Sequence, residues 1–229
     1  MPRSVYRRRL SPALTRGCPF DCSIAQSRPW RPKKEWKASH MTRRIKEKPL
    51  QKTPETTFLI LIDVQEKLVA AMHHKASLVE NVIRLVKGLR ILGVPVLFTE
   101  QNPAGLGPTI PPLRLLLADN RPITKLSFSC CGEKAFLDAL KVLRRQHALV
   151  CGIECHVCVY QSVADLVAQG YEVQVVSDAV ASRTLENKEI GLQRCREMGA
   201  SITSVETILF ELLRRAEGPA FKEILGVVK

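Results

Sequence analysis

The sequence lacks several features that would assign it to a class at once. It has no apolar run of about 18 residues, so it predicts no membrane-spanning helix. No apolar segment of the secretory type is present near its start, which disfavours a signal peptide. The glycine patterns G-x-G-x-x-G and G-x-x-x-x-G-K-[ST] are also missing, so a dinucleotide or P-loop site is not expected. These absences predict a protein without membrane contact and without a nucleotide cofactor.

Positive charge is abundant, but it is confined to one part of the chain. The 229 residues include 35 Lys or Arg and 22 Asp or Glu. Residues 1–52 hold 15 of the basic and three of the acidic residues, which leaves 20 basic and 19 acidic residues in the remaining 177. Because this larger part is nearly neutral, we do not expect it to bind nucleic acid.

The basic segment 1–52 has no sustained apolar period, so we predict a disordered tail. It contains six of the 14 prolines and both tryptophans. An Arg-rich organelle presequence and an arm for nucleic acid or membrane surfaces are alternatives. The prolines disfavour the amphipathic helix that a presequence needs. We favour a third interpretation, in which Met41 is the true start and residues 1–40 are an over-extended reading frame.

Eight cysteines are a high number for one chain. In a short secreted protein they would indicate disulfides. This chain is longer, shows no signal peptide, and places Cys151 inside an apolar run. Reduced thiols are therefore the simpler interpretation, and they predict a cytoplasmic protein.

From residue 58 onward, short apolar runs alternate with longer segments of helical periodicity. Strands are predicted at 58–63, 94–99, 122–125, 148–152, 173–177 and 201–203. Helices are predicted at 77–92, 132–145, 157–169, 186–198, 205–215 and 221–228, with an irregular loop at 101–112. Such alternation requires right-handed crossovers. We expect an α/β fold of three layers, with a mostly parallel six-stranded sheet and helices on both faces.

Three chemically active side chains follow predicted strands. Asp63 closes the first apolar run, Lys125 ends the third strand, and Cys158 lies beyond the fourth, where a turn enters a helix. The carboxyl ends of parallel strands share one edge of the sheet, so an acid, an ammonium and a thiol are expected to meet there. A thiol at a helix N-terminus is expected to have a lowered pKa and to act as a nucleophile.

Together with their neighbours, these residues resemble the isochorismatase-like cysteine hydrolases. The matching motifs are Asp63-Val64-Gln65, Thr99-Glu100-Gln101, Thr124-Lys125, Gly152-Ile153 through Cys158-Val159, Ser177-Asp178-Ala179 and Ser182-Arg183. The resemblance extends from about residue 58 to the C-terminus. It implies that residues 53–229 form one hydrolase domain that acts on a small molecule and assembles as a homo-oligomer.

The resemblance also implies a role for each residue. Cys158 would attack a carbonyl or imine carbon and form a covalent intermediate. Asp63 would take the thiol proton and return it to the leaving group, while Lys125 would keep Asp63 ionised and stabilise the thiolate. The backbone N–H groups of Glu154 and Cys158 would bind the oxyanion. A cis peptide bond without proline is implied at Ile153–Glu154.

Because Cys158 matches the cysteine-hydrolase branches of the family, the resemblance implies that the substrate has a C–N bond, in an amide or ureide, that is cleaved through a thioester-type intermediate. Gln101, Asn102 and Phe128 are candidates for lining the substrate pocket, with loop solvation and core packing as the alternatives. Nicotinamidases, one branch of the family, hold a metal through histidines near the second strand. Residues 99–107 contain no histidine, so neither a metal nor another cofactor is expected.

Other interpretations remain open. Cys158 is also explained as a buried small residue, Asp63 as a helix N-cap, and Lys125 as a solvated lysine. The C-x-x-C formed by Cys155 and Cys158 suggests a thiol–disulfide redox protein. A zinc site would combine Cys155, His156 and Cys158 with Cys18 and Cys22, which lie in the tail. A non-catalytic protein of the same fold that binds a small molecule is a further alternative.

Overall fold

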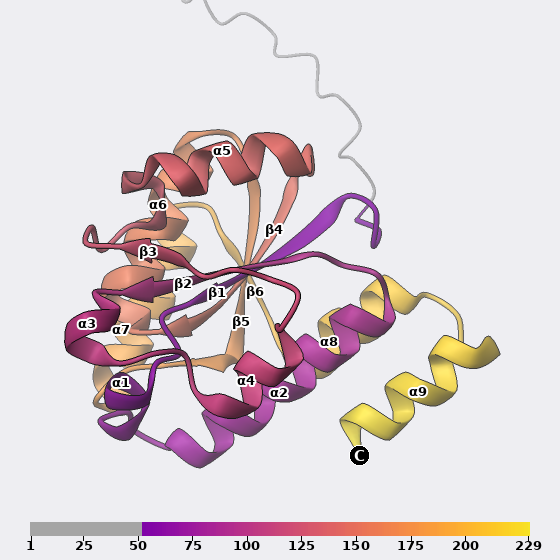
Figure 1. Ribbon diagram of the computed structural model, residues 1–229. Coiled ribbons are helices and arrows are strands. Elements are labelled where there is room, and N and C mark those ends of the chain that lie inside the picture. The colour runs from indigo at the N-terminus through magenta and orange to yellow at the C-terminus, as the bar shows by residue number, and fades with distance from the viewer. Residues whose placement is uncertain (1–51) are drawn as a thin grey trace, which may run out of the picture. The chain divides into compact units, whose positions relative to one another are not determined.

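The computed structural model describes residues 52–229, so residues 1–51 of the predicted tail lie outside the described part of the chain (Figure 1). Six strands form one sheet in the order β3-β2-β1-β4-β5-β6. They are β1 (Thr57–Ile62), β2 (Val96–Gln101), β3 (Ile123–Lys125), β4 (His147–Ile153), β5 (Glu172–Ala181) and β6 (Ser201–Thr203). Every pairing between these strands is parallel, which confirms the predicted fold class.

Helices cover both faces of the sheet (Figure 1). The helices of the described residues are α1 (Glu66–Ala70), α2 (Lys75–Ile91), α3 (Pro103–Leu106), α4 (Pro111–Leu116), α5 (Lys134–Leu143), α6 (Tyr160–Ala168), α7 (Leu185–Glu197), α8 (Val205–Leu213) and α9 (Gly218–Val228). Helices α2, α8 and α9 share one apolar cluster with the sheet, and α5, α6 and α7 share the other. None of these helices is long and apolar enough to cross a bilayer.

The central strand β1 shows why the sheet is covered on both sides. All six of its residues are buried. Leu59 and Leu61 point into the cluster with α2, whereas Phe58, Ile60 and Ile62 point into the cluster with α5 and α6. Burying each such side chain contributes about 1.5–3 kcal/mol, so an uninterrupted apolar run is stable only between two helical layers.

The elements differ from the predicted ones mainly at the carboxyl edge. β5 continues to Ala181, so Ser177-Asp178-Ala179 lies within a strand and not after one. A register shift between Val150 and Gly152 of β4 accompanies this longer pairing. The predicted irregular loop 101–112 contains α3 and the start of α4, and each begins with a proline, a residue compatible with the first turn of a helix.

Gly152 allows β4 to approach β1 closely at this edge. Its φ is +115°, in the region that favours glycine. A Cβ atom at this position would lie 2.1 Å from the Ile62 carbonyl oxygen. The turn after β4 can therefore lie directly beside the residue that follows β1, which is Asp63.

Candidate active site

An ion pair lies at the carboxyl edge of the sheet. The Lys125 Nζ is 2.6 Å from the Asp63 Oδ2, and both side chains are fully buried. Lys125 ends β3 and Asp63 follows β1, so the lysine side chain crosses the end of β2, the strand between them. Asp63 and Lys125 therefore lie together at this edge, as the sequence predicted.

The other carboxylate oxygen is also occupied. The Thr99 hydroxyl donates a 2.7 Å hydrogen bond to Asp63 Oδ1. The Cys130 thiol lies 4.0 Å from that hydroxyl. The backbone N–H of Cys130 donates a hydrogen bond to the Ser162 hydroxyl on α6. The carboxylate is thus oriented by a hydroxyl on one side and by an ammonium on the other.

Four oxygens surround the Lys125 ammonium. In addition to Asp63, it contacts Gln101 Oε1 at 2.6 Å, the Phe128 carbonyl at 3.1 Å and the Ser127 carbonyl at 3.2 Å. An ammonium has only three N–H groups, so it cannot donate to a substrate without giving up a partner. Lys125 therefore acts as a fixed positive charge, which excludes its interpretation as a solvated lysine.

Cys158 lies between β4 and α6, in a π-helical turn that spans Cys155–Val159. The Asp63 carboxylate, the Lys125 ammonium and the Glu154 backbone lie close enough to its thiol to shift its pKa. Burial, followed by the negative charge of Asp63, raises the pKa of the Cys158 thiol to about 12. The predicted lowering of this pKa is wrong, because α6 begins only at Tyr160 and burial outweighs the helix N-terminus.

Burial also raises the pKa of the Asp63 carboxyl. The Lys125 ammonium opposes this shift, in the direction expected from the sequence, but burial is the larger effect. A carboxylate with a raised pKa accepts a proton more readily. The resting centre therefore pairs a protonated thiol with an unusually basic carboxylate.

The turn that carries Cys158 is anchored to the end of β5. The peptide bond between Ile153 and Glu154 is cis, which confirms the expectation from the family resemblance. The Glu154 carboxylate accepts hydrogen bonds from the side-chain Nε (2.9 Å) and the backbone N–H (3.3 Å) of Arg183. His156 Nδ1 lies 2.9 Å from the Ser182 hydroxyl. These contacts explain why the Ser182-Arg183 motif accompanies the cysteine motif.

Cys155 faces a different environment from Cys158. It is fully buried, and its charged or titratable neighbours are Cys195 and Lys188 on α7. Helix α7 packs directly on this side of the turn, since a Cβ on Gly191 would lie 2.7 Å from the Cys155 carbonyl carbon. The two thiols of the C-x-x-C are thus surrounded by different groups, which weakens the redox interpretation.

The predicted pocket residues have other partners in the structure. The Gln101 side chain accepts from Lys125 and donates to the Leu126 carbonyl at 2.9 Å. Phe128 contributes its carbonyl to Lys125, and the residue as a whole is 55% exposed. Asn102 is exposed, and its side-chain amide lies over Gly105 in α3. Two of the three residues thus belong to the surroundings of Lys125.

Sequence reasoning gave no role to Gln65, Thr99 or Cys130, although all three lie at this centre. Gln65 and Thr99 belong to the family motifs. Their signal in the sequence was a polar residue at or just after the end of an apolar run, and the structure buries both of them. Cys130 had no such signal, because it precedes a helix in a segment that resembles an ordinary connection.

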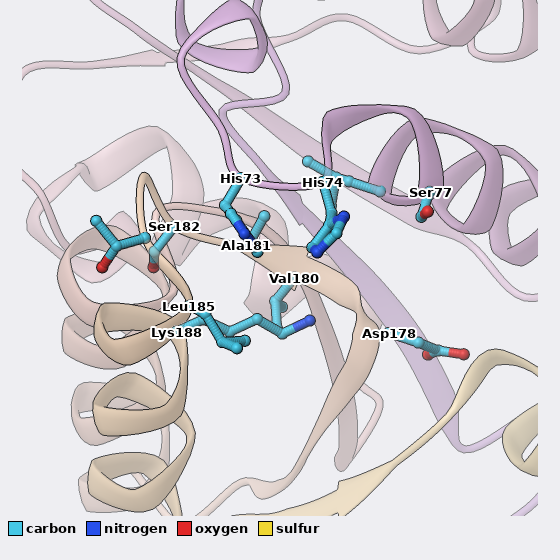
Figure 2. Close-up of a pocket in the computed structure, with 11 residues that line it drawn as sticks. His73, His74, Ser77, Asp178, Val180, Ala181, Ser182, Leu185 and Lys188 are labelled. Carbon is cyan, nitrogen blue, oxygen red and sulfur yellow. The ribbon is translucent and has the colours of Figure 1, made fainter.

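A separate hollow lies at the end of β5, between the first turns of α2 and α7 (Figure 2). Its volume is about 60 Å³, and its lining includes His73, His74, Lys188 and Ser182. Neither Asp63 nor Cys158 lines it. Ser182 contacts His156, which connects this hollow to the turn that carries Cys158.

The described residues offer no evident metal site. Among residues 52–229, no group of three or more His, Cys, Asp or Glu is placed to hold a metal ion. Cys18 and Cys22, which the zinc alternative requires, lie outside the described part of the chain.

A parallel α/β sheet with a buried acid, lysine and thiol at its carboxyl edge defines a class of hydrolase-like proteins. The Isochorismatase domain family matches residues 57–207, more than half of the chain. The chain therefore belongs to the isochorismatase family, as its motifs predicted.

Individual relatives support this assignment. Isochorismatase domain-containing protein 2A of Mus musculus is 38% identical over 177 residues, covering 77% of this chain and 84% of that protein. The secreted isochorismatase effector Isc1 of Phytophthora sojae is 36% identical over 180 residues, covering 77% and 86%. The structure of the MAR1 ribonuclease from Caenorhabditis elegans aligns with a TM-score of 0.73 at 35% identity, covering 78% of this chain and 92% of that chain.

Proposed function

We propose that this protein hydrolyses a small, neutral molecule at a C–N bond, with Cys158 as nucleophile, Asp63 as proton carrier and Lys125 as a fixed charge. The observation that carries the proposal is the buried Asp63 carboxylate, which is ion-paired with Lys125 at 2.6 Å and lies close enough to the Cys158 thiol to shift its pKa. Membership of the isochorismatase family supports a hydrolase.

The chemistry proceeds in two halves. As the Cys158 sulfur bonds to the carbonyl carbon, its proton moves to Asp63 and the carbonyl electrons move to oxygen. The backbone N–H groups of Glu154 and Cys158, which belong to the same turn as the sulfur, would stabilise the oxyanion. When the oxyanion collapses, the C–N bond breaks and Asp63 returns the proton to the leaving nitrogen, which leaves a thioester.

Water completes the reaction. Asp63 takes a proton from the water as its oxygen attacks the thioester carbon, and a second oxyanion forms in the same place. Its collapse breaks the C–S bond, and the Cys158 thiolate recovers the proton from Asp63. The Lys125 charge lies beside the carboxylate throughout, so it limits the build-up of negative charge in a water-poor site.

A neutral substrate fits the charges of the centre. Among residues 52–229, Lys125 is the one buried Lys or Arg, and its N–H groups are occupied. A polyanion requires several cations at its phosphates. Ribonuclease activity, named for the relative from Caenorhabditis elegans, is therefore the second candidate, supported by sequence identity and not by this centre.

Two further expectations belong to the proposal. That the protein forms a homo-oligomer, and that it needs no cofactor, both stay predictions. The cytoplasmic location also stays a prediction, because a relative of similar identity is a secreted effector.

The decisive experiment is an activity screen combined with intact-mass analysis. The purified protein is incubated with a panel of amides and ureides and, separately, with RNA, and each reaction is quenched by acid. We expect turnover of at least one amide or ureide, and a mass increase on Cys158 that equals its acyl part. Cleavage of RNA that survives Cys158→Ala would overturn the proposal. A reversible loss of two hydrogens on oxidation, located to Cys155 and Cys158, would favour the redox alternative.

A further inference from the structure

Two glutamines connect the backbone of the sheet edge to the Lys125 ammonium. We propose that Gln65 and Gln101 are positioning residues of the catalytic centre: Gln65 fixes the backbone of Gln101, and the Gln101 side chain holds Lys125 against Asp63. The proposal rests on the function proposed above, since it concerns the same centre. It replaces the sequence-based expectation that Gln101 lines the substrate pocket.

Gln65 takes the place of a missing strand partner. Pairing between β1 and β2 ends at Ile62 and Thr99, whereas β2 continues to Gln101. The fully buried Gln65 side chain accepts the Gln101 backbone N–H at 2.7 Å and donates to the Gln101 carbonyl at 3.0 Å. The same amide donates to the Gly107 carbonyl at 2.6 Å. Both main-chain groups of Gln101 are thereby satisfied on the side where β1 has ended.

The side chain of Gln101 is held at both ends. Its oxygen accepts from Lys125 at 2.6 Å, and its nitrogen donates to the Leu126 carbonyl at 2.9 Å. Only one orientation of the amide satisfies both contacts. Among the uncharged acceptors of Lys125, this oxygen is closer than the two carbonyls of the loop after β3. Gln101 and Asp63 therefore hold the ammonium from two sides.

The neutrality of Gln101 matters as much as its position. A neutral acceptor fixes the ammonium without adding charge to the centre. A glutamate at this position would have nearly the same shape, but its negative charge would disfavour the Cys158 thiolate. The variant Gln101→Glu thus separates a role exerted through the charge of Lys125 from a role in packing alone.

Alkylation of Cys158 by iodoacetamide reports this coupling without any substrate. Rates are measured between about pH 7 and pH 9 and assigned to Cys158 by peptide mass spectrometry. Below the thiol pKa the rate follows the thiolate fraction, so one pKa unit changes it by about tenfold. We expect Gln101→Glu to slow alkylation by about tenfold, and Gln101→Leu and Gln65→Leu to slow it by about threefold. The control Gln146→Leu, which removes a glutamine bonded to the Gly170 carbonyl at the other end of the sheet, leaves the rate unchanged.

A double-mutant cycle tests the route through Lys125. In a Lys125→Met background, Gln101→Leu should have no further effect on alkylation, because the charge that Gln101 positions is gone. If Lys125→Met does not fold, the two Gln101 variants decide the matter, provided that their urea midpoints match the wild type. Alkylation within twofold of the wild type in both Gln101 variants would overturn the positioning role. So would an equal slowing by Gln101→Leu with and without Lys125.

The outcome also separates this inference from the proposed function. A protein that hydrolyses no amide or ureide, yet shows the expected alkylation changes, would retain the positioning role and lose the hydrolase assignment. A protein that hydrolyses a substrate through Cys158, with alkylation unchanged in both Gln101 variants, would retain the function and lose the positioning role.

Discussion

The turn between β4 and α6 has two unlike sides, each with its own cysteine. On one side the Cys158 thiol lies under the influence of the Asp63 carboxylate, which is ion-paired with Lys125. On the other side Cys155 packs against α7, and the Cys195 thiol and the Lys188 ammonium of that helix are the titratable groups that act on it. Burial raises the pKa of both Cys155 and Cys158 to about 12, so neither is a thiolate at rest. Under the proposed mechanism, reactivity at this turn therefore depends on a proton acceptor near the thiol and not on a pre-formed thiolate.

The strongest test of this difference replaces each cysteine in turn. We expect Cys158→Ala to lower kcat/KM by about 10³-fold or more, since the nucleophile is lost. Cys155→Ala should retain most of the activity and lose about 1 kcal/mol of unfolding free energy, because it removes only a buried sulfur. Steady-state kinetics and urea unfolding measure the two effects. Equal loss of activity in both variants would remove the distinction between the two sides.

Removing the proton acceptor is the next largest expected effect. In Asp63→Asn the amide cannot take the Cys158 proton, and we expect kcat to fall by about 10²–10⁴-fold. Intact-mass analysis should show no acyl-enzyme. The alkylation rate of Cys155 in the same variant should stay at its wild-type value, because Asp63 is not among its charged neighbours. An active Asp63→Asn protein would show that another group takes the proton.

The packed side of the turn can be disturbed without touching a cysteine. In Gly191→Ala the new Cβ would lie 2.7 Å from the backbone carbon of Cys155 and from the His156 nitrogen. Such overpacking costs about 1–3 kcal/mol of unfolding free energy, measured by urea titration. Gly226→Ala in α9 is the matched control, since no atom lies within 4 Å of its Cβ position. That control should be neutral or stabilising by up to about 1 kcal/mol. A neutral Gly191→Ala would contradict the close contact with α7.

The pH dependence of alkylation compares the two thiols directly. A pKa raised to about 12 means that the folded protein reacts more slowly than free cysteine at pH 8. The rate should rise about tenfold per pH unit to at least pH 10, without a plateau. Cys158 should be labelled before Cys155, because it is 7% exposed and Cys155 is fully buried. A plateau near pH 7 at Cys158 would indicate a thiolate at rest.

The smallest expected effect is that of chelation. Exhaustive treatment with EDTA or 1,10-phenanthroline should leave hydrolysis unchanged, because the proposed mechanism uses only side chains and the backbone. A zinc ion bound through both Cys155 and Cys158 would remove the difference between the two sides of the turn. Loss of activity on chelation, restored by added zinc, would therefore contradict both the comparison and the mechanism.

Much of the site was predictable, because parallel strands obey a strong geometric rule. Three polar residues that follow three apolar runs must meet at one edge, whatever the loops between them do. This rule brought Asp63 and Lys125 together from positions far apart in the chain. The pKa of Cys158 was not predictable in the same way. The expected lowering considered the helix N-terminus alone, whereas the shift depends on how many atoms displace water around the sulfur.

The amino-acid sequence by itself determined the alternation of strands and helices, and it placed the candidate site at the carboxyl edge of the sheet. Both follow from local periodicity and from the shared direction of parallel strands. Only the tertiary structure decided what surrounds Cys155, since Gly191 and Cys195 of α7 approach the turn from a distant part of the chain. It also decided that the Gln101 side chain accepts a hydrogen bond from Lys125, because the direction of a side chain at a strand end depends on the partners that fold around it. Long-range packing sets these contacts, and no local pattern in the sequence records them.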